Sequence, residues 1–144
     1  MKTCVSMAGA IAVLLSTISC AAQARSPEPV PLDRVECSRC RMLISTDRGA
    51  GQVVSTEEDT RFYDDVGCLA ADWVEQRNQA TPYVRVYNSE WKDARKAVYA
   101  NHTESRTAMG SGLVAFDTEE EARLVSPGSR ILTWDDVVSD RGKQ

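Results

Sequence analysis

The chain has 144 residues, with 21 acidic against 17 basic side chains and a formal net charge of −4. An acidic chain of this kind is a poor binder of nucleic acids and of anionic membrane surfaces, and its length suits one compact domain with a modest core. We therefore expect no nucleic acid among its partners.

The first 24 residues have the pattern of a secretory signal peptide. Lys2 precedes a mostly apolar run from residue 5 to residue 18, and small residues follow as far as Ala24. This run is too short to span a membrane. Cleavage after Ala24 would release a soluble protein, whereas cleavage before Cys20 would leave a lipidated cysteine that anchors the chain to the membrane. Both alternatives predict an exported, periplasmic protein whose thiols meet an oxidising compartment.

The remainder is predicted to be a single domain. Residues 25–33 form a proline-rich tether, residues 34–138 the domain, and residues 139–144 a polar tail. Apolar or alternating runs predict strands at 52–56, 60–64, 83–87, from Lys96 onward, 113–116 and 131–134. Helices are predicted after Asp64 or Asp65 as the cap, at 119–125 after a capping box of Thr118 and Glu121, and as one turn at 135–138. Because strand, strand, helix occurs twice, we expect an α+β fold of two similar ββα-type halves around a mixed or antiparallel sheet.

Sulfur is concentrated between residues 35 and 44, where Cys37, Cys40 and Met42 lie close together. If residues 40–42 are extended, the Cys40 and Met42 side chains point to the same side and could share one ion. Removal of the signal leaves three cysteines, the third being Cys68. An odd number of thiols cannot all pair within the chain, so at least one of them is left for another purpose or stays idle.

Two more sulfur residues, Cys68 and Met109, occur after this stretch. Cys68 lies in the first turn of the first helix, off its apolar stripe, where the helix N-terminus favours a thiolate; the alternative is a small residue covered by a neighbouring loop. Met109 lies with His102 in a polar loop, between small residues that let its thioether approach another segment. The alternative for Met109 is that it fills a gap in the core.

Four segments occur together in the order seen in one protein family: Cys37–Met42, Phe62–Cys68, Trp91–Arg95 and Ala108–Phe116. They resemble the NosL family, exported copper-binding accessory proteins of nitrous oxide reductase maturation that are commonly lipoproteins. The resemblance implies two ββα-type halves, Cu(I) as cargo, and ligation by Cys40, Met42 and Met109. It also implies delivery to nitrous oxide reductase or to the membrane complex that matures it. Where the family usually has Gly between the Cys and the Met, this chain has Arg41.

The chemistry of the residues agrees with that resemblance. Thiolate and thioether sulfur are soft ligands that select Cu(I). We therefore predict a copper site of Cys40, Met42, Met109 and Cys37, with Cys68 and His102 as further candidates. A site of this kind could surrender its ion to a richer acceptor by stepwise ligand exchange. Delivery to a cuproenzyme, without catalysis, is the predicted function.

Three other hypotheses use the same residues or their neighbours. A structural zinc site in a protein-interaction domain would have a complete ligand set in Cys37, Cys40, Cys68 and His102. A Cys-x-x-Cys redox protein would use Cys37 and Cys40, although such pairs usually precede a helix within a βαβ unit. An enzyme is the least favoured, because the mature chain has one histidine and the adjacent pair Asp64–Asp65 is more typical of a helix cap than of an acid/base couple.

Overall fold

A unit of two strands, a helix and a third strand occurs twice in the chain. The computed structural model describes residues 25–75, 80–88, 90–101 and 107–141. The first unit consists of β1 (Gly51–Val54), β2 (Arg61–Tyr63), α1 (Val66–Glu75) and β3 (Thr81–Arg85). The second consists of β5 (Val98–Asn101), β6 (Leu113–Phe116), α2 (Glu119–Val125) and β7 (Ile131–Leu132). Strand β4 (Trp91–Asp93) and the 3₁₀ helix η1 (Ala94–Lys96) connect the units, and α3 (Trp134–Arg141) follows the second.

Each unit folds into its own antiparallel sheet. The strand orders are β2-β1-β3-β4 and β6-β5-β7, so the first strand of each unit lies between the other two. A parallel bridge between Val86 and Ala115 joins the two sheets, and the Tyr87 N–H donates to the Ala115 carbonyl at 2.8 Å. The predicted small domain of mixed helices and strands is confirmed. The described residues form two antiparallel sheets and three α-helices, where one sheet was expected.

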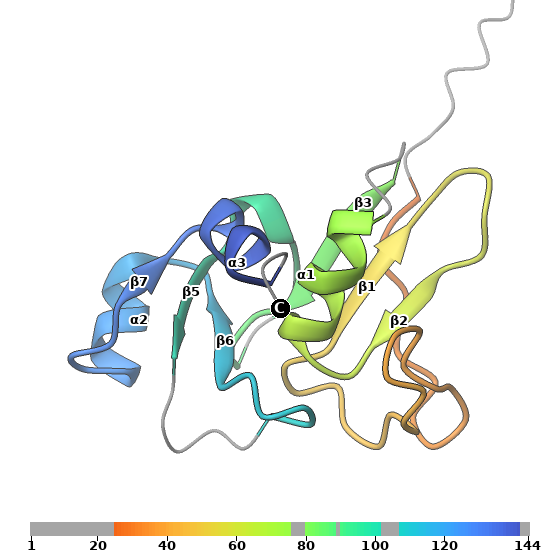
Figure 1. The fold of residues 1–144 in the computed structure, drawn as a ribbon, viewed down its shortest axis with the longest axis horizontal. Helices are drawn as coiled ribbons and strands as arrows, with labels where there is room; N and C mark the ends of the chain where they lie inside the picture. Colours follow the sequence, from red (N-terminus) through yellow and green to blue (C-terminus); the bar gives the residue numbers. More distant parts are fainter. Residues whose placement is uncertain (1–24, 76–79, 89, 102–106, 142–144) are drawn as a thin grey trace, which may run out of the picture.

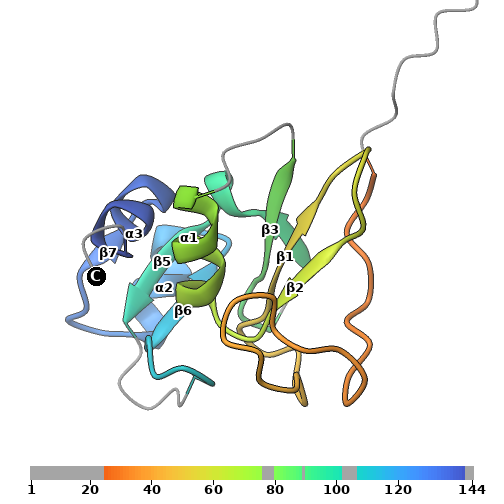
Figure 2. The ribbon, with the colours of Figure 1, turned by 45° about the vertical axis from the view of Figure 1, so that its right-hand side comes forward.

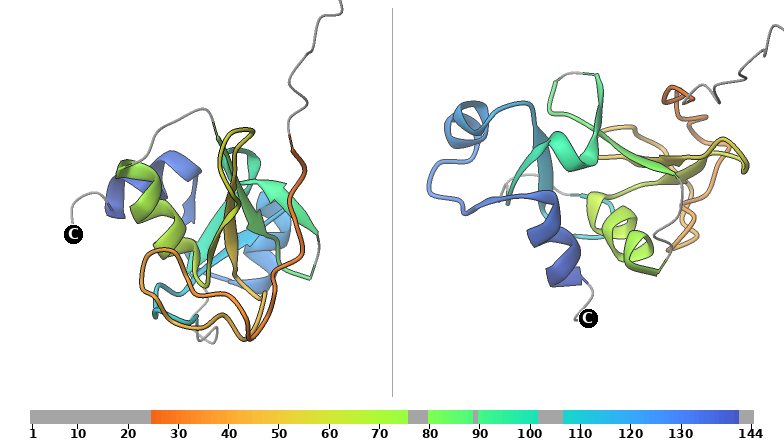
Figure 3. Two further views of the ribbon diagram at one scale, coloured as in Figure 1. Left: turned by 90° about the vertical axis from the view of Figure 1, so that its right-hand side faces the viewer. Right: turned by 90° about the horizontal axis from the view of Figure 1, so that it is seen from above.

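Helix α1 holds the two halves together. It contacts β1, β2 and β3 of its own half, and β6 and α3 of the other; α1 and α3 lie against each other in Figure 1 and in the left panel of Figure 3. The predicted apolar stripe is confirmed at Val66 and Leu69, which are fully buried. A Cβ on Gly51 would lie 2.7 Å from Leu69 Cδ2, so the absence of a side chain there lets α1 approach β1 closely.

Helix starts follow the predicted caps, with one change of boundary. Asp65 accepts from Gly67 N–H at 2.6 Å, and the Thr118 side chain accepts from Glu121 N–H at 3.1 Å. Trp134 was predicted to end a strand, but β7 ends at Leu132 and Trp134 begins α3. The reason is that the Asp136 side chain accepts from Thr133 N–H while Thr133 Oγ1 accepts from Asp136 N–H, which closes a helix start at this point.

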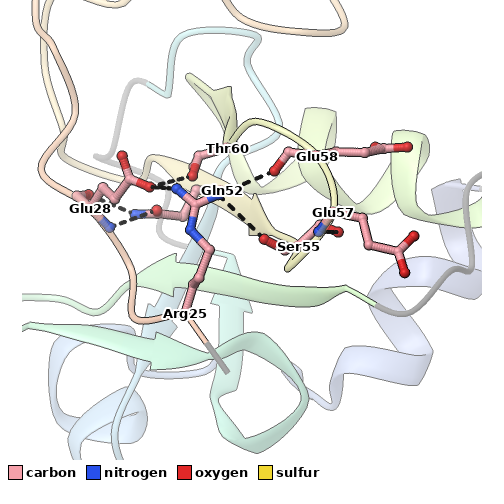
Figure 4. Close-up of polar contacts among 7 residues, drawn as sticks. All are labelled: Arg25, Glu28, Gln52, Ser55, Glu57, Glu58 and Thr60. Atoms are coloured by element: carbon pink, nitrogen blue, oxygen red, sulfur yellow. Dashed lines mark hydrogen bonds and ion pairs between the residues drawn. The ribbon is translucent and has the colours of Figure 1, made fainter. Parts of the chain in front are cut away.

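The stretch assigned to a proline-rich tether contacts the first sheet (Figure 4). Glu28 N–H donates to Gln52 Oε1, and Gln52 Nε2 donates to the Glu28 carbonyl, both at 2.9 Å. The Glu28 carboxylate also accepts from Thr60 Oγ1 and from the Arg25 guanidinium, each at 2.6 Å. Gln52 is fully buried in β1. Its side-chain amide therefore pairs with this segment as a neighbouring strand would.

Among the described residues, no helix is long and apolar enough to cross a membrane. The predicted signal peptide, the lipidation candidate Cys20 and the ligand candidate His102 lie outside the described part of the chain. Helix α3 extends to Arg141, into the stretch predicted to be a polar tail.

Candidate metal centre

The two cysteines of the Cys-x-x-Cys segment lie on a tight turn. A bridge between Glu36 and Leu43 closes it, Cys37 N–H donates to the Met42 carbonyl at 2.8 Å, and Arg41 N–H donates to the Cys37 carbonyl at 3.0 Å. Arg41 has φ = 66°, a left-handed conformation that reverses the chain direction. Residues 40–42 are therefore not extended, so the condition under which strand alternation would align Cys40 with Met42 is not met.

This turn is fixed next to the start of α1. Ser38 N–H donates to the Phe62 carbonyl in β2 at 2.8 Å, and β2 leads directly into Asp64 and α1. Figures 1 and 2 show the turn segment, in orange, at the end of the molecule where α1 begins. Two distant parts of the sequence therefore face each other, one with two thiols and the other with Asp64 and Cys68.

The facing side chains form a compact cluster of four possible metal ligands. One ligand atom each from Cys37, Cys40, Asp64 and Cys68 lies within 4.8 Å of all the others. Three of these residues are buried, while Cys40 is half-buried and its thiol donates to Asp64 Oδ2 at 3.3 Å. All three cysteines are free thiols. In a tetrahedral site with metal–sulfur bonds of about 2.3 Å the ligand atoms are about 3.7 Å apart, so a small contraction would close this cluster on an ion.

A second observation fits a cation here. Asp64 Oδ1 is buried and has no hydrogen-bond partner among the described residues. A buried carboxylate oxygen without a partner destabilises the folded state. A metal ion among the three sulfur atoms would supply the missing partner, because carboxylate oxygen and thiolate sulfur are both ligands of protein-bound metals.

The three thiols differ in acidity because they hydrogen-bond to one another. The pKa of Cys37 is lowered to about 6, chiefly by a hydrogen bond from the Cys68 thiol; backbone N–H groups of Cys40, Asp64 and Arg39 act in the same direction, and burial opposes them. The same hydrogen bond raises the pKa of Cys68. Burial, with the hydrogen bonds to Cys37 and Asp64, raises the pKa of Cys40 to about 11. The metal-free cluster therefore favours one thiolate, on Cys37.

Cys68 was predicted to lie on the polar side of α1, and the structure shows what covers that side. It is 7% exposed, because the turn of Cys37 and Cys40 packs over the first turn of α1. Cover by a neighbouring loop was the alternative prediction for Cys68. The loop carries two further thiols, so burial and possible ligation apply to the same residue.

Neither of the methionines in the described part of the chain fills the core. Met42 and Met109 are 47% and 49% exposed. Met42 adjoins the cluster through the bond of its carbonyl to Cys37 N–H, and Met109 N–H donates to Asp65 Oδ2, next to Asp64, at 3.2 Å. The backbone of Met42 is thus held next to Cys37, and that of Met109 next to Asp65, the residue that follows Asp64. Ligation by either thioether stays a prediction.

The sequence pattern did not single out Asp64 as a ligand. Adjacent aspartates before a helix are typical of a cap, but one residue suffices for a cap, and in the structure that residue is Asp65. The second carboxylate therefore had no assigned partner in the sequence. An aspartate beyond the one that the cap needs was the only sign in the sequence that Asp64 could be a ligand. Only the fold shows that Asp64 faces the Cys37–Cys40 turn.

The comparison with protein families covers most of the chain, since the model of the NosL family matches residues 29–141. The chain belongs to the NosL family. Among solved structures, the copper chaperone NosL from Shewanella denitrificans is 20% identical, with a TM-score of 0.58 over 80% of this chain and 95% of that one. At this identity the likeness shows a shared fold. No curated protein matches the sequence.

In this NosL chain the cluster has an inner and an outer part. Cys37, Cys68 and Asp64 are buried, whereas Cys40 is half-buried and Met42 and Met109 are exposed. An approaching molecule would therefore reach the Cys40 thiol before the thiols of Cys37 and Cys68. A site arranged in this way could exchange ligands one at a time.

Proposed function

We propose that this protein is an exported metallochaperone that binds Cu(I) and delivers it for assembly of a cuproenzyme, nitrous oxide reductase. The observation that carries the proposal is the group of three free thiols and Asp64 within 4.8 Å in a NosL-family domain. Two exposed methionines support it, since the backbone of Met42 bonds to Cys37 and that of Met109 bonds to Asp65. The solved relative is described as a copper chaperone. Delivery, without catalysis on a substrate, is consistent with that description.

The donor set favours Cu(I) over harder ions. Thiolates and thioethers are soft ligands, and Cu(I) prefers them, whereas oxygen ligands suit harder cations. The proposed site uses Cys40, Met42 and Met109, with Cys37 and Cys68 behind them. Stepwise replacement of the exposed thioethers by an acceptor's ligands would let the ion leave before the inner thiols rearrange.

The proposed acceptor and location are supported by the sequence alone. The resemblance to proteins of nitrous oxide reductase maturation favours that enzyme, or the membrane complex that matures it, as the partner. The signal pattern of residues 1–24 favours the periplasm, with a lipid anchor on Cys20 or a soluble form that begins at Arg25.

A structural zinc site remains the second candidate function, and one observation favours it. Cys37, Cys40, Cys68 and Asp64 supply four ligands without either methionine and without His102, and zinc sites commonly have four cysteine, histidine or carboxylate ligands. The redox hypothesis gains no such support, because Cys37 and Cys40 lie on a turn between bridged segments and precede no helix.

Metal choice separates the two candidates. Under anaerobic, reducing conditions the mature protein should bind one Cu(I) and keep it in competition with a Cu(I) chelator, with a strong preference over Zn(II). Cys40→Ser should abolish Cu(I) binding, while Cys37→Ser and Cys68→Ser should weaken it less. The Met42→Leu/Met109→Leu double variant should lose Cu(I) faster. Tight Zn(II) binding that survives this double substitution, together with weak Cu(I) binding, would establish the zinc site instead.

A further inference from the structure

Asp65 joins two segments that contribute to the candidate site. It is fully buried, and each of its carboxylate oxygens accepts from a backbone N–H group. Oδ1 accepts from Gly67 in the first turn of α1, at 2.6 Å. Oδ2 accepts from Met109, 44 residues further along the chain, at 3.2 Å. One side chain therefore holds both the turn of α1 that carries Cys68 and the backbone of Met109.

Close packing shows independently that this loop rests on α1. A Cβ added to Gly67 would lie 3.0 Å from Ser111 Cβ, so the loop approaches the helix where no side chain intervenes. The loop is also tied to itself: the Thr107 carbonyl accepts from Gly110 N–H at 3.0 Å, and Thr107 Oγ1 accepts from Gly112 N–H at 3.0 Å. Seating the backbone of residues 107–112 therefore fixes the point from which the Met109 side chain extends.

We propose that Asp65 is a positioning residue that seats Met109 beside the thiol cluster and so slows the departure of copper. The inference rests on the proposed Cu(I) function. Met109 is half exposed, so side-chain packing does little to fix its thioether. The hydrogen bond to a buried carboxylate is stronger than one between neutral groups, and its loss would free the loop to move away from α1.

The sharpest variant is Asp65→Asn, which keeps the shape of the side chain but has only one acceptor oxygen for two N–H groups. Asparagine is as good a helix cap as aspartate, so α1 should keep its start and Met109 should lose its partner. We expect Cu(I) to dissociate about tenfold faster, the size expected for the loss of one charged hydrogen bond. X-ray absorption of the copper form should show one sulfur neighbour fewer.

A double-variant cycle separates this positioning role from a merely structural one. In a Met109→Leu background, Asp65→Asn should add nothing to the dissociation rate, because the thioether that it positions is gone. Asp65→Ser should behave like Asp65→Asn, since serine caps helices but is too short to serve both amides. Thr118→Ala is the matched control: it removes the cap of α2, which packs on β5, β6 and β7, and should leave copper dissociation unchanged.

Several outcomes would overturn the proposal. An unchanged dissociation rate in Asp65→Asn, or an equal acceleration with and without Met109, would mean that Asp65 only caps α1. Hydrogen exchange of the Met109 amide in the metal-free protein tests, without copper, whether Asp65 holds the Met109 backbone. Unchanged protection of this amide in Asp65→Asn would refute the positioning role. If the unmutated protein binds no Cu(I), the proposed function fails. This inference then fails with it, even if hydrogen exchange shows that Asp65 holds the Met109 backbone.

Discussion

Arg41 is the residue with the clearest conformational conflict. Its φ of 66° lies in the left-handed region, which costs a residue with a Cβ roughly 1 kcal/mol and costs glycine almost nothing. Its side chain is largely exposed and lies 3.6 Å from the Glu36 carboxylate, an ion pair of little value at the surface. The glycine usual in the family at this position thus has a physical reason, the turn that brings Cys40 back toward Cys37.

Arg41→Gly should therefore stabilise the metal-free protein by about 1 kcal/mol. Chemical denaturation under reducing conditions would measure the change. Arg41→Ala is the matched control, because it removes the guanidinium but keeps the Cβ, and it should give no such gain. Equal stabilisation by both variants would attribute the effect to the side chain and not to the backbone.

Asp64 supplies the one hard ligand of the cluster, so its loss should affect metals unequally. Asp64→Asn should lower affinity for Zn(II) by about 10- to 100-fold and affect Cu(I) less, since Cu(I) depends on the sulfur ligands. Competition titrations with both metals would show the difference. The exposed Asp135→Asn serves as a control for the change in charge. An equal loss for both metals would make Asp64 a copper ligand too.

Secondary-structure elements could be predicted from the sequence where the residues that determine them lie within a few positions of each other. The starts of α1 and α2 follow from caps at Asp65 and Thr118, and the apolar stripe of α1 from its spacing. The turn at Arg41 could not be predicted, because no glycine marks it. Nor could the role of Asp64, because its partner Cys40 is 24 residues away and only tertiary packing brings the two together.

The N-terminal segment is an element that composition alone assigned to a tether. Gln52→Leu should free it, because the substitution leaves the Glu28 N–H and carbonyl without partners, at a cost of about 1–3 kcal/mol. Denaturation and hydrogen exchange of residues 25–30 would measure both effects. Glu28→Ala keeps the backbone pair to Gln52 and should release the segment far less. Similar exchange in the two variants would show that the carboxylate contacts to Thr60 and Arg25 hold the segment.

At the scale of the whole molecule, the larger of two core clusters joins the two halves, and the smaller one lies within the second half. Buried residues of the first half, such as Val53 and Leu69, belong to the same cluster as Tyr99 and Trp134 of the second. Apart from Cys37 and Cys68, the buried members of this cluster are apolar or aromatic side chains that are not metal ligands. We therefore expect the protein to stay folded without metal and to unfold in a single transition.

Thermal unfolding followed by circular dichroism, with and without Cu(I), tests this expectation. The metal-free protein should have native secondary structure, and Cu(I) should raise the midpoint in proportion to the logarithm of free metal above its dissociation constant. Cys40→Ser should remove the shift and keep the metal-free midpoint. Loss of structure on removal of metal would mark the site as structural, in keeping with the zinc hypothesis.

The repeated unit also gives the molecule an internal reference. Where β2 enters α1, Asp65 is the cap and Cys68 is the third residue of the helix; where β6 enters α2, Thr118 is the cap and Glu121 the third residue. Glu121 there accepts from Asp117 N–H at 3.1 Å, a purely structural bond. The two joints have the same connection, but within the described part of the chain only the first adjoins a cluster of candidate metal ligands. Backbone relaxation measured at both joints in a single sample would show how much less rigid the β2–α1 joint is than the β6–α2 joint. That difference is the rigidity lost where the candidate site must admit and release an ion.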